Sequence, residues 1–219
     1  MEISKRTGLP EQFMAEITFT TDASLHGDYG GENFVHEITG RISLRNTDDE
    51  TEETAGELKA WLIHFSEAQA HGISSRILGD GYSLELSRYW QELFAFDEFK
   101  AEIQKAWQTE GSDLLVVRSI QILDQFQEHG IGLAALGRTI NLFSRSCDLV
   151  ACLPDAMEEF CDAGLDAAKT RRLEVNAGQL KKAIATLTDD LIAAGFQQWG
   201  DAGLYLLNPT HERPDVLLE

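Results

Sequence analysis

The chain has 219 residues, and its 18 Lys and Arg against 37 Asp and Glu give a formal net charge of −19. This balance argues against a nucleic-acid partner, because duplex binding needs a basic surface that displaces counterions, and it disfavours an anionic membrane surface as well. With 43% hydrophobic and 25% charged residues, the composition is typical of a globular protein.

Neither a membrane span nor an export signal is expected. No apolar run approaches the roughly 20 residues of a transmembrane helix, and the basic start at residues 1–6 is not followed by the apolar stretch of a signal peptide. Cys147, Cys152 and Cys161 form an odd, sparse set without a Cys-x-x-Cys pair, so we expect neither a disulfide framework nor a zinc site. The sequence therefore predicts a cytoplasmic protein without a metal.

The first 65 residues predict β-structure. Apolar residues alternate with polar ones over residues 13–19 and 34–44, which is the period of a half-buried strand, and residues 58–65 predict a third, less regular strand. Residues 46–54 are acidic and are expected to be the solvated loop of a hairpin, since charge runs usually face water. A contact between this segment and a cationic substrate is the alternative.

The pattern then changes to helical spacing. Two amphipathic helices are predicted, with aromatic residues that face the core. Their apolar stripes are Tyr82, Leu86, Tyr89, Trp90 and Leu93 in the first, and Phe99, Ile103 and Trp107 in the second.

A βαβ unit is predicted in the middle of the chain. Residues 114–123 are apolar and rich in β-branched side chains, which indicates a central strand covered on both faces. The polar residues 124–129 lead to Gly130 and Gly132, and a helix follows with the stripe Leu133, Leu136, Ile140 and Phe143. Residues 149–153 predict a short strand stopped by Pro154, so the two strands should be parallel neighbours.

The last third of the chain predicts one helix and a hairpin. Residues 155–175 give no clear prediction. Asn176 is expected to cap a helix with the stripe Leu180, Ile184, Leu187 and Leu191, and Gly195 to end it. Residues 196–199 and 204–208 then predict two strands joined by a glycine turn.

The glycine loop predicts a phosphate site. Gly130 and Gly132 lie where a strand leads into a helix, and the first amides of a helix have no internal partner. Together with the helix dipole, these amides favour an anion, and glycine lets the backbone approach a bulky phosphate. A phosphorylated cofactor is therefore expected, and an unoccupied tight turn is the alternative.

One class of cofactor that fits this loop is a dinucleotide. Gly130-x-Gly132-x-x-Ala135 satisfies the Rossmann fingerprint, and Asp155 lies 20 residues beyond Ala135. Six residues separate Leu123 from Gly130, however, and the unit follows an antiparallel region and ends in a hairpin, which disfavours this alternative.

The other class is an acyl-coenzyme A. The segment Gln127-Glu128-His129-Gly130-Ile131-Gly132 resembles the Arg/Gln-x-x-Gly-x-Gly/Ala signature of the GNAT superfamily of N-acyltransferases, and a strand ends five residues before it. Residues 191–196 and the following hairpin resemble that family's closing helix, Gly-Phe pair and last two strands. The resemblance covers roughly residues 113–153 and 180–208. Before residue 113 it is poor, because three strands here precede the helices.

The resemblance implies a single α/β domain over residues 1–219, with a central mixed β-sheet flanked by helices in a GNAT-like fold. Residues 1–112 would be its divergent N-terminal half, and residues 113–208 its acyl-CoA-binding core and C-terminal hairpin. It also implies acetyl-CoA or another acyl-CoA as co-substrate, and direct attack by an amine, either a small molecule or a peptide. The last strands of such folds often pair across a homodimer.

Site residues follow from the same resemblance. The pantetheine arm would bond the backbone of the central strand, at Ile120, Gln121 and Ile122. The diphosphate would lie on the amides of Gln127, Glu128, His129, Gly130, Ile131, Gly132 and Leu133. The strand at residues 149–153 would splay from the central strand and open a slot for the thioester, and the amine would enter from the other side.

Catalytic residues are not assigned. Leu191 stands where family enzymes often have a Tyr general acid, and Leu133 stands where a polar or basic residue is common. Asp124, His64, Tyr205 and His129 are candidates for proton transfer, and none of them is favoured. Proximity alone can accelerate attack on an activated thioester, and the acidic chain would attract a cationic amine. A non-catalytic acyl-CoA-binding module is the alternative.

Overall fold

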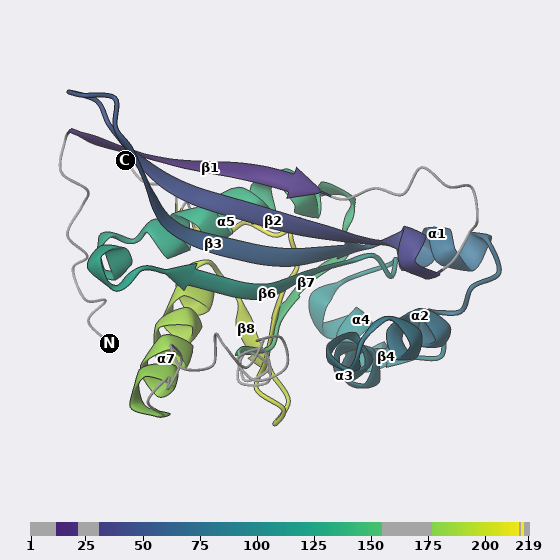
Figure 1. Ribbon diagram of the computed structural model, residues 1–219. Coiled ribbons are helices and arrows are strands. Elements are labelled where there is room, and N and C mark those ends of the chain that lie inside the picture. The colour runs from purple at the N-terminus through teal and green to yellow at the C-terminus, as the bar shows by residue number, and fades with distance from the viewer. Residues whose placement is uncertain (1–11, 22–30, 155–176, 215, 217–219) are drawn as a thin grey trace.

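The computed structural model describes residues 12–21, 31–154, 177–214 and 216. Seven of its strands form one sheet in the order β1-β2-β3-β6-β7-β9-β8 (Figure 1). Their bounds are β1 Phe13–Thr21, β2 Val35–Asn46, β3 Glu52–Ile63, β6 Leu114–Ile122, β7 Leu149–Cys152, β8 Gln197–Trp199 and β9 Leu204–Leu207. Only β6 and β7 pair in parallel, and every other pair in this sheet is antiparallel. The predicted mixed sheet flanked by helices is confirmed.

Helices cover both faces of the sheet. At one end of the sheet lie α1 Phe65–Ala70, α2 Ser75–Tyr82, α3 Leu84–Leu93 and α4 Ala101–Trp107, with the small hairpin of β4 Phe94–Ala95 and β5 Glu98–Phe99 (Figure 1). The opposite face packs against α5 Ile131–Phe143 and α7 Ala177–Ala193. Short 3-10 helices are η1 Gly31–Phe34, η2 Asp124–His129 and η3 Ser144–Ser146. Within the described residues, no helix combines the length and hydropathy needed to cross a membrane.

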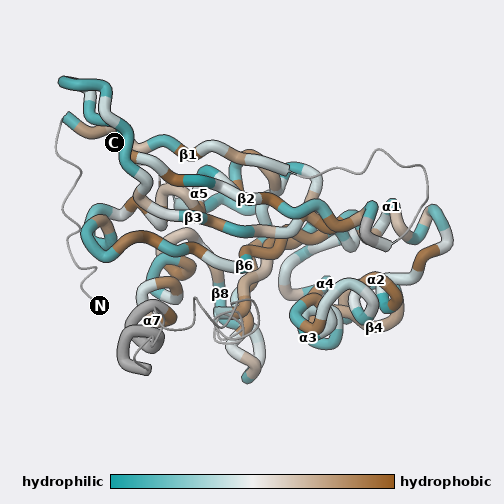
Figure 2. The backbone as a smooth tube through the Cα atoms, in the orientation of Figure 1, coloured by the Kyte–Doolittle hydropathy of each residue, from teal (hydrophilic) through white to brown (hydrophobic). Residues whose placement is uncertain are grey.

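The predicted hairpin near the N-terminus is present, but its loop is shorter than expected. β3 begins at Glu52, six residues before the predicted strand, and it ends at Ile63, so that Phe65 opens α1 instead. Glu52 and Thr54 pair with Arg45 and Ser43, and the two strands extend past the core as a hydrophilic ribbon (Figure 2). Charged side chains that face water on both sides do not prevent backbone pairing. The first residues of β3 are acidic and polar, so the sequence predicted a loop where the strand begins.

The helical region is divided more finely than predicted. Tyr82 ends α2, and α3 begins at Leu84 because the Ser83 side chain accepts a hydrogen bond from the Leu86 amide at 3.0 Å. Phe99 lies on β5 rather than on the second predicted helix. Of the aromatic residues predicted to face the core, Tyr89, Phe99 and Trp107 are buried, and Tyr82 and Trp90 are partly buried against the same cluster.

The central strand carries a bulge halfway along its length. Lys59 of β3 pairs with Ser119, and Ala60 pairs with Val117, so Arg118 is an extra residue on β6. Because the bulge reverses the alternation of side chains, Val117 and Ile120 both face the core under α5.

The predicted C-terminal elements are confirmed where the structure describes them. α7 buries Leu187 and Leu191, and Gly195 follows it in the left-handed conformation with φ of 96°. The hairpin of β8 and β9 follows, and β9 pairs with β7. Residues 155–175, including Asp155, and the predicted cap Asn176 lie outside the described residues.

One carboxylate joins the starts of β6 and β7. Asp148 accepts hydrogen bonds from the backbone amides of Gly111 and Asp113, each at 3.0 Å. A Cβ at residue 111 would collide with this carboxylate, so the close approach requires glycine there. The two hydrogen bonds hold the segment before β6 next to Leu149, the first residue of β7.

We predict that Asp148→Ala lowers the free energy of unfolding by about 2 kcal/mol, because two partly buried amides lose their acceptor. The matched control is Asp49→Ala in the exposed β2–β3 turn, where the carboxylate accepts from the Thr51 amide and hydroxyl. This control should cost less than about 1 kcal/mol. Urea unfolding followed by circular dichroism measures both, and equal losses would contradict the role given to Asp148.

Candidate functional site

The two parallel strands part after a short ladder. β6 and β7 pair over four residues, from Leu114 with Leu149 to Val117 with Cys152. Beyond Val117, β6 continues to Ile122 and pairs only with β3. No described strand adds to its other edge over residues 118–122. We call the place where the strands separate, beyond the Val117–Cys152 pair, the fork.

Two residues explain why β7 stops at the fork. The backbone N–H of Leu153 donates to the hydroxyl oxygen of Tyr89 on α3 at 2.8 Å, instead of continuing a strand ladder. Pro154 has no N–H to donate. Tyr89 is fully buried, and burial, with Cys152 and Glu85 nearby, raises its pKa well above 10, so the hydroxyl keeps its proton. After Cys152, the backbone of β7 therefore stops pairing with β6, and the Leu153 N–H bonds to α3 instead.

Arg118, the bulged residue on β6, is also held by α3. Its Nε and Nη2 donate to the same oxygen of Glu85 at 3.1 and 2.9 Å, and its guanidinium lies 3.7 Å from the centre of the Trp61 ring. Side-chain exposure is only 12% for Arg118 and 8% for Glu85. Glu85 and Tyr89 are one turn apart on α3, so this helix contacts both strands of the fork.

An accessible carboxylate lies beside this cluster. Glu37 on β2 accepts hydrogen bonds from Trp61 Nε1 and the Tyr82 hydroxyl, both at 3.2 Å, and lies 3.9 Å from Arg118. Its side chain is 51% exposed. Burial, together with Glu37, raises the pKa of Tyr82 to about 12. The α3 side of the fork therefore presents a fixed, partly exposed negative charge next to aromatic rings.

The opposite face of the fork carries the glycine loop. Residues 124–129 form the 3-10 helix η2, and Gly130 caps α5 in the left-handed conformation with φ of 73°. No side chain caps this helix. The first amide that bonds back along α5 is that of Ala134, to the Gly130 carbonyl at 3.0 Å. The amides of residues 131–133 precede that bond, which is where a helix binds an anion.

Loop and strand residues named by the sequence lie together. A Cβ on Gly132 would be 3.3 Å from Ile122 Cγ1 and 3.6 Å from Ile120 Cγ2. The first turn of α5 therefore packs directly on the half of β6 that does not pair with β7. Gln127 donates to the Ile122 carbonyl at 3.2 Å, which turns its side chain back towards the strand end. Gln121 and Glu128 are exposed.

Other loop residues are more enclosed. Ile131 is buried at 2% exposure, His129 is half-buried, and Leu133 packs against the core under α5. The Leu133 side chain therefore contributes to the core and cannot donate a hydrogen bond to a phosphate, as a polar or basic residue at this position could.

A buried carboxylate that the sequence did not indicate lies at the same place. Asp190 on α7 is 6% exposed, and one of its oxygens would be 3.4 Å from a Cβ on Gly132. A carboxylate near the first turn of a helix is stabilised by the dipole, and it would repel a phosphate that approached the same amides. The next residue, Leu191, which stands where a Tyr general acid is common, is buried as well.

The candidates for proton transfer are spread over the molecule. His64 lies at the far end of the sheet, 3.5 Å from Asp113, and its hydrogen bond to Asp113 raises its pKa. Asp124 is exposed and accepts from Gln127 at 3.0 Å, which is a turn contact. Tyr205 on β9 pairs with Cys152, the last residue of β7, and so lies next to the fork. His129 lies in η2, beside the glycine loop.

Metal ligands are not grouped in the part of the chain that the structure describes, where no three His, Cys, Asp or Glu residues come close enough to hold an ion. Cys147 and Cys152 are free and buried. Burial raises the pKa of the Cys147 thiol to about 12 and that of Cys152 further still, so both thiols stay protonated.

We predict that Tyr89→Phe lowers the free energy of unfolding by about 1–3 kcal/mol, because the buried Leu153 amide at the end of β7 loses the hydroxyl oxygen that accepts its hydrogen bond. Tyr82→Phe is the matched control, since its hydroxyl donates to the partly exposed Glu37, and it should cost less than about 1 kcal/mol. Chemical denaturation compares the two variants. A Tyr89→Phe protein as stable as the parent would show that the hydroxyl does not end β7.

No family model, no curated protein and no solved structure matches this chain. Its function must therefore be inferred from the residues around the fork.

Proposed function

We propose that this protein is an acyl-CoA-dependent N-acyltransferase with a GNAT-like fold, which transfers an acetyl or other acyl group from its coenzyme A thioester to an amine. The fork is the observation that carries the proposal. Over residues 118–122, β6 has an edge that no described strand covers, and the first turn of α5 packs on the side chains of Ile120 and Ile122 in this segment. Backbone groups at such an edge can bond an extended arm such as pantetheine, while helix amides suit its diphosphate.

The order of elements supports the same proposal. A central strand, glycine loop, helix and parallel strand are followed by α7, the Gly195–Phe196 pair and a hairpin. This is the order that the GNAT resemblance implies for the C-terminal half. The sheet has one parallel pair among six, which does not favour the dinucleotide alternative, because a Rossmann domain is built on a mostly parallel sheet.

The chemistry would take place between the two faces of the fork. With coenzyme A on the α5 side, the amine approaches from the α3 side, where Glu37 offers a negative charge to an ammonium. The ammonium first loses a proton to solvent. The neutral amine then attacks the thioester carbonyl and forms the C–N bond, the C–S bond breaks, and the second proton lost by the nitrogen passes through solvent to the departing thiolate, which becomes the thiol of coenzyme A. Proximity and orientation supply the acceleration. No residue is assigned as catalytic.

A non-catalytic acyl-CoA-binding module is the second candidate, and Leu191 favours it, because the family's usual Tyr is replaced by a buried leucine. Asp190 does not distinguish the two candidates, since a buried carboxylate beside the first turn of α5 opposes phosphate binding in both. For either candidate we propose a cytoplasmic location, which suits the free thiols of Cys147 and Cys152.

Binding of coenzyme A is tested with two glycine variants. Gly130 and Gly72 have φ of 73° and 79°, so Gly130→Trp and Gly72→Trp should strain the backbone alike. Gly130→Trp places an indole over the first amides of α5, while Gly72 has open space around it. We expect Gly130→Trp to weaken acetyl-CoA binding about tenfold or more, a loss of roughly 1.4 kcal/mol, and Gly72→Trp to leave it unchanged. Isothermal titration measures both, and equal affinity in all three proteins would remove the loop from the site.

Turnover is tested by thiol release from acetyl-CoA across a panel of amines. We expect Glu37→Gln to lower kcat/KM for cationic amines about threefold to tenfold, because the ammonium loses an attracting charge, without changing the affinity for acetyl-CoA. Glu16→Gln on β1 is the control, since it removes the same charge from a carboxylate that pairs with Arg45. If acetyl-CoA binds but no amine releases thiol, the enzyme proposal fails and the binding module is supported.

A further inference from the structure

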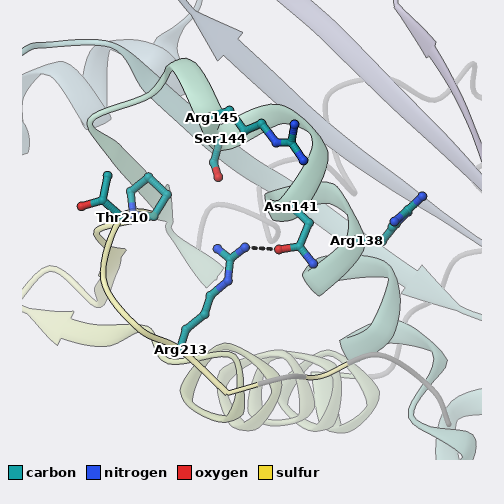
Figure 3. A pocket seen from close by; sticks show the side chains of 7 residues that line it. Arg138, Asn141, Ser144, Arg145, Thr210 and Arg213 are labelled. Atoms are coloured by element: carbon teal, nitrogen blue, oxygen red, sulfur yellow. Dashed lines mark hydrogen bonds between the residues drawn. The ribbon is translucent and has the colours of Figure 1, made fainter.

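A second candidate site lies on the outer side of α5. A cavity of about 380 Å³ opens between the C-terminal half of α5, η3 and the chain that follows β9 (Figure 3). This volume is within the range of about 300–1,000 Å³ that small-molecule sites occupy. The cavity is lined by Arg138, Asn141, Ser144, Arg145, Pro209, Thr210 and Arg213.

Its lining is cationic in a protein that is acidic overall. Three of the lining residues are arginines and none is a carboxylate, although the chain has a net charge of −19. Arg138 and Arg145 are exposed, and within the described residues neither forms an ion pair. Three guanidinium groups around one cavity repel one another unless an anion lies between them.

Arg213 points to an anionic ligand most directly. Its Nη2 donates to Asn141 Oδ1 on α5, as Figure 3 shows, whereas its Nη1 is buried and has no hydrogen-bond partner among the described residues. A buried charged donor without an acceptor is costly. Burial also lowers the pKa of Arg213, and a bound anion would offset this cost of burying its positive charge.

The wall of the cavity is fixed by the chain after β9. Asn208 is 3% exposed, its amide donates to the Trp107 carbonyl, and its oxygen accepts from the backbone and hydroxyl of Thr210 at 2.8 and 2.7 Å. Further on, Arg213 Cβ and Pro214 Cδ lie 3.6 and 3.4 Å from a Cβ built on Gly195, at the end of α7. The arginine is thus carried by a segment anchored at two points, which is what a preformed site needs.

The cavity is distinct from the fork. Arg138 lies eight residues beyond the cap Gly130 along α5, which is about 12 Å at 1.5 Å per residue, and Arg145 lies beyond the end of the helix in η3. The lining residues include none of those that form the fork or the glycine loop.

We propose that this cavity binds the phosphate group of a small phosphorylated molecule, at a site separate from the fork. Guanidinium groups present paired N–H donors that match phosphate oxygens, and a dianion balances most of the charge of three arginines. The hydroxyls of Ser144 and Thr210 already donate to the Ile140 carbonyl and to Asn208 Oδ1, so the arginines supply the donors for an anion. The phosphate can come from free inorganic phosphate or from a phosphate ester, and the experiment separates these two sources from the 3′-phosphate of coenzyme A, whose binding would contradict a separate site.

The test is isothermal titration of the full chain in phosphate-free buffer at low ionic strength. Inorganic phosphate and glucose 6-phosphate are the probes, and glucose is the uncharged control. The variants are Arg145→Gln, Arg213→Gln and, as a matched loss of charge elsewhere, Arg76→Gln on α2, whose partner is the exposed Asp80.

We expect a phosphate probe to bind the parent. Each of the two cavity variants should lower the affinity for the probe about tenfold, because one charge-assisted hydrogen bond is lost. Arg76→Gln should leave the affinity within about twofold, because surface charges are screened.

Three results would overturn the proposal. The first is the absence of saturable binding of either phosphate probe to the parent. The second is equal binding to the parent and to Arg145→Gln, which changes an exposed side chain and should not affect folding. The third is a comparison of coenzyme A with dephospho-coenzyme A in which Arg145→Gln weakens only the former and phosphate competes with it. That outcome would assign the cavity to the cofactor's own 3′-phosphate. Additive binding of phosphate and coenzyme A supports a separate site.

Discussion

The shortness of the ladder between β6 and β7 is the constraint on which the rest of this structure depends. Four residue pairs join the strands, and then the Leu153 amide bonds to Tyr89 and Pro154 offers no donor. On the other strand, the bulge at Arg118 directs its guanidinium to Glu85. Since Glu85 and Tyr89 lie on one helix, α3 determines where the parallel pair ends and leaves the second half of β6 with an open edge.

The two faces of the fork differ in electrostatic character, and this difference underlies the proposed function. One face has the capping glycine and first amides of α5, which favour an anion, and the other has the half-exposed Glu37, which favours a cation. Asp190 is an exception to this division, because it brings a buried carboxyl group to the amide face. If coenzyme A binds there, its diphosphate has to lie on the outer amides, away from Asp190, with the arm along residues 118–122.

Elements with strong local patterns were predictable from the sequence, and contacts across the sheet were not. The apolar run of β6, the glycine loop before α5, the left-handed cap at Gly195 and the end of the α7 stripe at Leu187 and Leu191 are local signals, and the structure confirms each of them. The start of β3 at Glu52 was missed because its pairing with β2 outweighs its polar composition. At the site, the glycine loop was predictable, but the roles of Tyr89, Glu85 and Asp190 depend on partners distant in sequence, 64 residues away for Tyr89 and Leu153. A helical stripe indicates that such residues are buried and does not indicate what they contact.

A crystal structure of the protein with coenzyme A tests the central claim most directly. The account predicts a diphosphate within hydrogen-bond distance of the amides of residues 130–133, and a pantetheine arm that extends along the open edge of β6 to the fork, with the thiol close to the Val117–Cys152 pair. A cofactor bound elsewhere, or a fork closed by side chains in crystals grown with saturating coenzyme A, would contradict it.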